Sequence, residues 1–382
     1  MEQLPIIDLN GLNAQTKPTI LKQMEFALTQ IGFMLVKAPE FDVHFQNECF
    51  KISHQFFDLP REIKDLYSNM NNPHFRGWGK GKKYDGKLIQ NYGMGVDHET
   101  TKYDYTDNSI PLYKRMRDGP NQWPATKHVA NFKPQMEELH KRYYKLSREI
   151  SYLICEILNV DRNIYDNYFD PENPFFGTAI NYYIPVSKIK DKKIQHEVAE
   201  SYKDVPGGEG GGMGAHRDGA PFITLLCCDN DGLQVLNPNT SKWLNVPYIP
   251  GTVIVNIGTT LMKLSKGKMI STTHRVNPNL FHVPRISLPY FLFPILEGDL
   301  VPFDEDQSRA GYNATEERQG RDRGLAYAVD RCNLFPDAAN KFYAKDYEKA
   351  LLEFKLEKER RMKEKMMINN GGNRKFKGNP RL

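Results

Sequence analysis

The sequence lacks any uninterrupted apolar run approaching the ~18 residues that a membrane-spanning helix needs. Its start, MEQLPIIDLNGL, has neither the basic segment nor the apolar segment of a secretory signal peptide. The five cysteines are an odd number and contain no CxxC pair, which argues against a disulfide framework and against a cysteine zinc site. We therefore expect a soluble, cytoplasmic protein with reduced and mostly buried thiols, and no membrane partner.

A basic core of the kind that binds nucleic acid is also missing, although the formal net charge is +5. Ten Lys or Arg and three Glu lie between Lys355 and Leu382, so this tail carries +7 and residues 1–354 carry about −2. Because the body is nearly neutral, we expect no nucleic acid partner. At 382 residues, of which 40% are hydrophobic, the chain is long enough to bury a substantial core.

The apolar pattern changes near residue 175. Before it, helical spacing predicts helices around 18–29, 45–57 and 143–158, and short apolar runs predict strands at 4–9 and 32–37. After it, short β-rich runs are separated by Gly, Asn, Pro and Asp at intervals of about 8–12 residues, which is typical of an all-β sandwich or barrel. These runs cover 179–183, 222–228, 232–236, 243–246, 252–257, 274–276 and 286–293.

We divide the chain into three regions. Residues 1–175 are a mostly helical N-terminal region that packs on the core and contributes to the substrate pocket, and 176–305 are the β core. Residues 306–382 form a C-terminal extension, with a helix from Asp337 and then a basic disordered tail. The predicted fold class is mainly β with flanking helices (α+β). The glycine-rich part of 188–214 does not match a phosphate-binding loop and is interpreted as a lid or insertion.

Two histidines and one aspartate carry the strongest chemical signal. His216 and Asp218 form an HxD pair, and residues i and i+2 of a strand point to the same face, so both can bind one ion. His274 lies on a later predicted strand and could complete the set. Two histidines and a carboxylate on one face of a metal are the ligands of mononuclear Fe(II) sites that activate O₂. By itself, however, an HxD pair also arises by chance, and a lone histidine is more often structural.

The sequence around these residues resembles that of a known family, the Fe(II)/2-oxoglutarate-dependent dioxygenases of the isopenicillin-N-synthase-like group. The resemblance rests on DGLQVLNPNTSKWLNVPYIPGTVIVNIGTTLMKLSKGKMISTTHRV, PRISLPYFLFP, INYYIP (180–185), FFDLPREIKDLY (56–67), IGFMLV (31–36) and LPIIDL. It covers about residues 4–300. It implies a double-stranded β-helix (jelly roll) core with a helical N-terminal region and a helical C-terminal extension. It also implies Fe(II), 2-oxoglutarate as cosubstrate, O₂, and ascorbate as a reductant.

The resemblance also implies residue roles. The metal ligands would be His216, Asp218 and His274. Arg285 and Ser287 match the RxS pair that holds the distal carboxylate of 2-oxoglutarate, and a guanidinium fork beside a hydroxyl suits a carboxylate. Asn181 and Tyr183 would form hydrogen bonds near the metal-chelating end of the cosubstrate. The candidates for the substrate pocket are Arg76, Tyr84 and Phe222. The NIGTT turn (256–260) departs from the family's NIGD, so a local turn contact is expected to differ.

The implied function is oxidation of an unactivated C–H bond of a small-molecule metabolite of secondary metabolism, with release of succinate and CO₂. Hydroxylation, desaturation and oxidative cyclisation are all compatible with the sequence. No separate acid or base is assigned, because the chemistry is centred on the metal. Two alternatives stay open: a 2-oxoglutarate-independent non-haem iron oxidase on the same scaffold, and a non-catalytic metal-binding jelly-roll module. We expect a monomer.

Overall fold

The structure is a computed structural model. It describes residues 3–80, 89–170, 174–193, 195–196, 213–297, 300–305, 307 and 323–372, without the side chains of 80, 357, 358 and 360–372. Tyr84, most of the glycine-rich stretch within 188–214 and the end of the expected disordered tail lie outside these residues.

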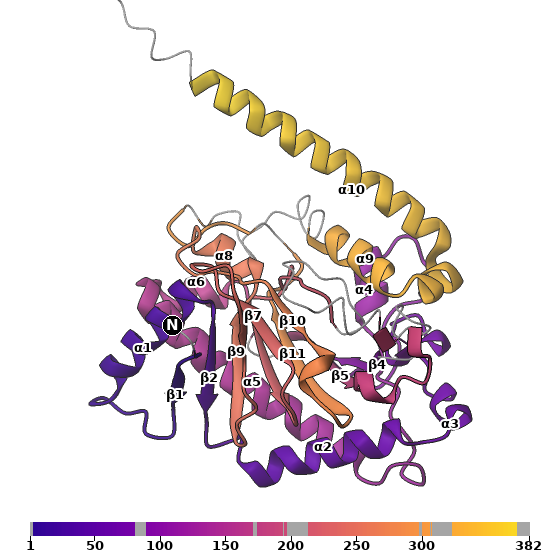
Figure 1. The fold of residues 1–382 in the computed structure, drawn as a ribbon. Helices are drawn as coiled ribbons and strands as arrows, with labels where there is room; N and C mark the ends of the chain where they lie inside the picture. Colours follow the sequence, from indigo (N-terminus) through magenta and orange to yellow (C-terminus); the bar gives the residue numbers. More distant parts are fainter. Residues whose placement is uncertain are drawn as a thin grey trace, which may run out of the picture.

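Two β-sheets form the core of the protein (Figure 1), as the sequence predicts. The minor sheet has the order β10 (His274–Val276), β7 (Leu233–Leu236), β8 (Trp243–Asn245). Neighbouring strands are antiparallel in both sheets, except for the parallel pair β1 and β2. The major sheet has the order β1 (Ile6–Asp8), β2 (Phe33–Lys37), β9 (Thr252–Ile257), β6 (Ile223–Cys228), β11 (Arg285–Phe293), β5 (Phe175–Tyr183), β4 (Ile89–Gly95), β3 (Gly77–Lys80).

The two faces of the major sheet belong to different apolar clusters, because successive side chains of a strand point to opposite faces. The outer face packs against α1 (Lys17–Gln30), α2 (Val43–Phe57) and α5 (Phe132–Leu158), which cover it in Figure 1. The inner face packs against the minor sheet. Adjacent Cys227 and Cys228 are buried on the outer and inner faces, respectively, and all five cysteines are buried free thiols, as expected.

The N-terminal region is less separate from the core than the sequence suggests, because it supplies four strands to the major sheet. β1 and β2 close one edge, whereas β3 and β4 extend the other edge beyond β5. The sequences of β3 (GWGK) and β4 (IQNYGMG) lack the apolar alternation that would have predicted them. The shorter helical elements are α3 (Arg61–Asp65), η1 (Asn69–Asn71), α4 (Leu112–Arg117), α6 (Arg162–Asp166), η3 (Val186–Lys188), α8 (Thr259–Leu264) and η4 (Pro278–Leu280).

The C-terminal extension forms two helices, where the sequence predicted one. The unexpected helix is α9 (Arg323–Leu334), which buries Ala328, Val329 and Cys332. It is followed by α10 (Pro336–Gly372), whose backbone leaves helical geometry at Tyr343 (φ −138°, ψ 23°). The far part of α10 extends away from the body (Figure 1) and includes the first residues of the stretch expected to be disordered. No helix among the described residues has the length and apolarity to span a membrane.

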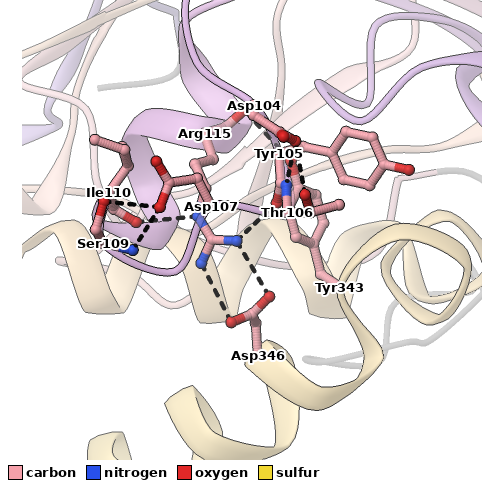
Figure 2. A network of polar contacts seen from close by, with 9 residues as sticks. All are labelled: Asp104, Tyr105, Thr106, Asp107, Ser109, Ile110, Arg115, Tyr343 and Asp346. Atoms are coloured by element: carbon pink, nitrogen blue, oxygen red, sulfur yellow. Dashed lines mark hydrogen bonds and ion pairs between the residues drawn. The ribbon is translucent and has the colours of Figure 1, made fainter.

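One buried arginine fastens this extension to the body (Figure 2). The Arg115 guanidinium is paired with Asp346 of α10 through two N–H···O contacts of 3.2 Å, and its side chain is 3% exposed. Its remaining donors reach the carbonyl oxygens of Ile110, at 3.0 Å, and Tyr105, at 2.7 Å. Tyr343 donates its hydroxyl to the Arg115 carbonyl at 3.3 Å. We call these contacts the Arg115 clamp.

Replacing Asp346 by Ala is expected to lower the free energy of unfolding by about 1–3 kcal/mol, because it leaves a buried guanidinium without its carboxylate. The matched control is Glu348→Ala, which removes an exposed carboxylate two residues further along α10. It should stay within about 0.5 kcal/mol of the wild type. Urea unfolding followed by far-UV circular dichroism measures both values. Equal effects of the two substitutions would show that the clamp does not fasten the extension.

Candidate metal centre

The two histidines of the predicted metal site are backbone partners. His216 forms an isolated antiparallel bridge to His274, with N–H···O bonds of 3.0 and 2.9 Å in the two directions. Their ring centroids are 4.3 Å apart. Asp218 completes the cluster: its Oδ1 lies 3.6 Å from Nε2 of His216 and 3.7 Å from Nε2 of His274. One ligand atom from each residue therefore lies within 4.8 Å of the others.

The orientation of both imidazoles is fixed by backbone carbonyls. Nδ1 of His216 lies 2.7 Å from the carbonyl of Gly214, and Nδ1 of His274 lies 3.1 Å from that of Thr272. A carbonyl oxygen only accepts, so each Nδ1 carries the proton and each Nε2 presents a lone pair. This is the hydrogen-bonding pattern of metal-ligating histidines.

Asp218 is oriented from the opposite sheet. Its Oδ2 accepts hydrogen bonds from the Thr224 hydroxyl (2.7 Å) on β6 and from the Asn256 amide (2.8 Å) on β9. Burial raises the pKa of this carboxyl, but the nearby His274, the Asn256 amide, His216 and the Thr224 hydroxyl outweigh burial and hold the pKa below its usual value. The carboxylate is therefore anionic, with Oδ1 left to face the histidines.

The sequence motifs did not indicate Asn256 and Thr224. The available signal was a buried polar residue inside the otherwise apolar strand TVIVNI. The HxD pair was also expected on a regular strand, whereas only His216 is paired, and Asp218 lies in the loop that follows. The NIGTT turn holds that loop: the amide of Thr259 donates to the Asp218 carbonyl at 2.8 Å.

The residues predicted to bind 2-oxoglutarate face one another across β11 and β5. Arg285 pairs with Tyr183 and Ser287 with Asn181 in the strand register. The Arg285 guanidinium carbon lies 5.2 Å from the centre of the Tyr183 ring, and the Tyr183 hydroxyl is hydrogen-bonded to Ser287 and Asn181. Burial, the largest effect, raises the pKa of Tyr183 despite these contacts.

Arg285 itself is incompletely paired. Its side chain is fully buried, and Nε donates to the carbonyl of Asn230 at 3.1 Å. Nη1 and Nη2 have no hydrogen-bond partner among the described residues. A buried cation with two free donors beside the Ser287 hydroxyl fits a carboxylate ligand. Two imidazole nitrogens and one carboxylate oxygen likewise fit Fe(II).

The three substrate candidates have different surroundings. Phe222 is fully buried, with its ring against those of Tyr165 and Phe169. This packing places it in the core on the helix side of the sheet, and its role in the substrate pocket stays a prediction. Tyr84 lies outside the described residues. Arg76 is 4% exposed and lies immediately before β3, at the other end of the major sheet from β1.

Comparison with known proteins gives two family matches. Residues 4–126 match the model of the non-haem dioxygenase in morphine synthesis N-terminal, and residues 178–294 match the 2OG-Fe(II) oxygenase superfamily. The second match contains every predicted metal and cosubstrate residue. The C-terminal extension lies outside both matches.

Similar proteins agree with these matches. The 2-oxoglutarate-dependent dioxygenase frbJ of Dothideomycetidae sp. (strain 11243) is 29% identical over 293 residues, which are 76% of this chain and 74% of that protein. Homoarginine-6-hydroxylase 2-ODD-C23 of Glycine max is 28% identical over 81% of this chain and 91% of its own. A full-length Neurospora crassa protein, crystallised in complex with alpha-KG and 5-formyluracil, has a TM-score of 0.61 at 25% identity, covering 86% and 95% of the chains. The chain belongs to the Fe(II)/2-oxoglutarate-dependent dioxygenases of the 2OG-Fe(II) oxygenase superfamily.

Proposed function

We propose that His216, Asp218 and His274 bind the catalytic Fe(II), and that Arg285 and Ser287 bind the distal carboxylate of 2-oxoglutarate. The observation that carries this assignment is the convergence of three ligand atoms within 4.8 Å, each backed by a hydrogen bond to a second group. The reaction oxidises an unactivated C–H bond of a small-molecule metabolite, with hydroxylation as the default outcome.

The protein residues position the reactants around the metal. Iron supplies the chemistry that activates O₂ when 2-oxoglutarate is bound. Arg285 lies deep between the sheets and orients the cosubstrate through its charge, while Asn181 and Tyr183 add hydrogen bonds nearer to the metal. Of the three ligand side chains, His216 is 38% exposed and Asp218 is 7% exposed, so we infer that substrate approaches past His216.

The two free Nη groups of Arg285 also bear on the two alternatives. A non-catalytic binding module needs no cosubstrate pocket, so the free Arg285 donors argue against it. A 2-oxoglutarate-independent oxidase on the same scaffold can carry the same Arg285 and Ser287 pair, so binding of 2-oxoglutarate itself has to separate that alternative. Two similar proteins support a small molecule as the substrate: the homoarginine hydroxylase of Glycine max, and the Neurospora crassa protein with its bound pyrimidine. The three-region division, the cytoplasmic location, the monomeric state and the absence of a nucleic acid partner stay predictions.

Replacing Arg285 by Gln is expected to weaken 2-oxoglutarate binding by about 2–4 kcal/mol, because a buried charge pair with the ligand is lost. That is roughly a 30- to 700-fold rise in Kd. Calorimetric titration of the Mn(II)-loaded protein measures it without turnover. The control is Arg162→Gln, which removes an exposed arginine on α6 and should leave the affinity unchanged. An unaltered Kd for Arg285→Gln would contradict the assigned role.

Replacing Asn256 by Ala is expected to weaken Fe(II) binding about 10- to 100-fold, because Asp218 loses one of the two donors that orient it. Competition with a chromophoric chelator under anaerobic conditions reports the metal affinity. Asn47→Ala removes an exposed amide from α2, on the far side of the major sheet, and serves as the control. If both variants retained the wild-type affinity, the orienting role of Asn256 would be wrong.

A further inference from the structure

A second buried arginine lies on the inner face of the major sheet. Arg76 is 4% exposed, and one Nη donates to the carbonyl of Arg117 at 3.1 Å. Its guanidinium lies against Gly95 of β4 so closely that a Cβ added at Gly95 would be 2.0 Å from Nη1. A side chain at residue 95 would therefore displace the guanidinium. The absence of a side chain at Gly95 leaves the space that the Arg76 guanidinium occupies.

The charge of Arg76 has no counter-ion among the described residues. Nε is buried without a hydrogen-bond partner, and no described carboxylate lies within ion-pair distance of the guanidinium. Asp118 is paired with Arg117, and Asp97 accepts from the Asn121 amide and the Trp123 indole. Burial lowers the pKa of Arg76 to about 10, which still leaves it protonated at neutral pH. A buried cation without an anion is costly, as at Arg285.

The strand register places Arg76 at the level of the metal ligands. One row of directly paired inner-face residues runs across five strands, in the order Gly95, Gly177, Phe291, Thr224, Asn256. Thr224 and Asn256, the last two residues of the row, donate hydrogen bonds to Asp218. The Arg76 guanidinium lies against Gly95, the first residue of the row. Three strand spacings of about 4.8 Å separate β4 from β6, so the row spans ~14 Å between them. Gly95 and Gly177 contribute no side chains to this part of the row, so Phe291 is the first side chain of the row beyond β5.

The C-terminal extension bounds the same end of the sheet. The Tyr327 ring of α9 packs 5.5 Å from the ring of Phe175, one row beyond Gly177. Tyr327 and Arg331 are the ionisable groups that act most strongly on the charge of Arg76, apart from burial. The extension thus lies beside Arg76 as well as being fastened by the Arg115 clamp.

The backbone immediately before Arg76 is strained, and the residue that carries the strain packs against the C-terminal extension. Phe75 has φ +56°, a conformation that is uncommon for a bulky residue and costs of order 1–3 kcal/mol. Its fully buried ring lies 5.8 Å from those of Phe335 and Tyr343, from α9–α10. Packing of the extension therefore maintains the turn that directs Arg76 into the inner face.

We propose that Arg76 is the anchor of a second anion-binding subsite, and that the substrate is a small molecule whose carboxylate binds there. The carbon to be oxidised then lies between Arg76 and the His216, Asp218 and His274 cluster, above Gly177 and Phe291, with Tyr327 of the C-terminal extension as the outer wall. This inference rests on the proposed function, because it takes that cluster as the reacting centre.

Matched pairs of carboxylates and their amides test the subsite. The protein is loaded with Mn(II) and saturating 2-oxoglutarate, which fills the Arg285 site, and is titrated calorimetrically with phenylacetate and phenylacetamide, hexanoate and hexanamide, and indole-3-acetate and indole-3-acetamide. We expect at least one carboxylate to bind at least tenfold more tightly than its amide. In Arg76→Gln this preference should fall to threefold or less, whereas Arg162→Gln should retain it.

Two further variants keep the test valid if Arg76→Gln folds poorly. Gly95→Ala keeps the arginine but displaces its guanidinium, and should also reduce the preference at least fivefold. Tyr327→Ala should weaken binding of the preferred carboxylate at least threefold. A wild-type protein without any carboxylate preference, or a preference that survives both Arg76→Gln and Gly95→Ala, would overturn the proposal. Unchanged 2-oxoglutarate binding in these variants separates that failure from failure of the proposed function, in which 2-oxoglutarate itself would not bind.

Discussion

The carboxylate of Asp218 links the two sheets of the jelly roll, and the candidate metal centre depends on it. One of its oxygens is fixed by Thr224 and Asn256 of the major sheet, and the other faces the imidazoles of His216 and His274. Bringing three such groups together in a buried place is unfavourable unless each polar atom has a partner. The backbone bridge between the two histidines and the NIGTT turn provide that order before any ion binds.

Two incompletely paired arginines lie on the same inner face as this arrangement. Arg285 and Arg76 are buried at the inner face, each with a backbone carbonyl as partner and no carboxylate among the described residues. Nε of Arg76 and both Nη atoms of Arg285 are buried without a hydrogen-bond partner among the described residues. These donors are the basis for proposing a carboxylate ligand at each arginine.

The sequence predicted the β core well because its strands carry the apolar and β-branched runs that fill the space between two layers. It did not predict β3 and β4, because their glycines interrupt the apolar alternation that marks a strand. Short motifs predicted the cluster of His216, Asp218 and His274 and the pair of Arg285 and Ser287. They did not indicate Asn256 and Thr224, because the contacts of these residues with Asp218 form only when two distant strands meet. The sequence also did not indicate that Phe222 packs on the helix side of the sheet, because nearness to the HxD pair in the sequence does not determine the face on which a ring packs.

The central claim is that iron and 2-oxoglutarate bind together at His216, Asp218 and His274. The most direct test is anaerobic: Fe(II) and then 2-oxoglutarate are added to the apoprotein, and the visible spectrum is recorded for a metal-to-ligand charge-transfer band. The account predicts a band with one equivalent of iron that is absent in His216→Ala. Stoichiometric iron binding without a band would contradict the role of 2-oxoglutarate, and failure to bind iron would contradict the metal centre itself.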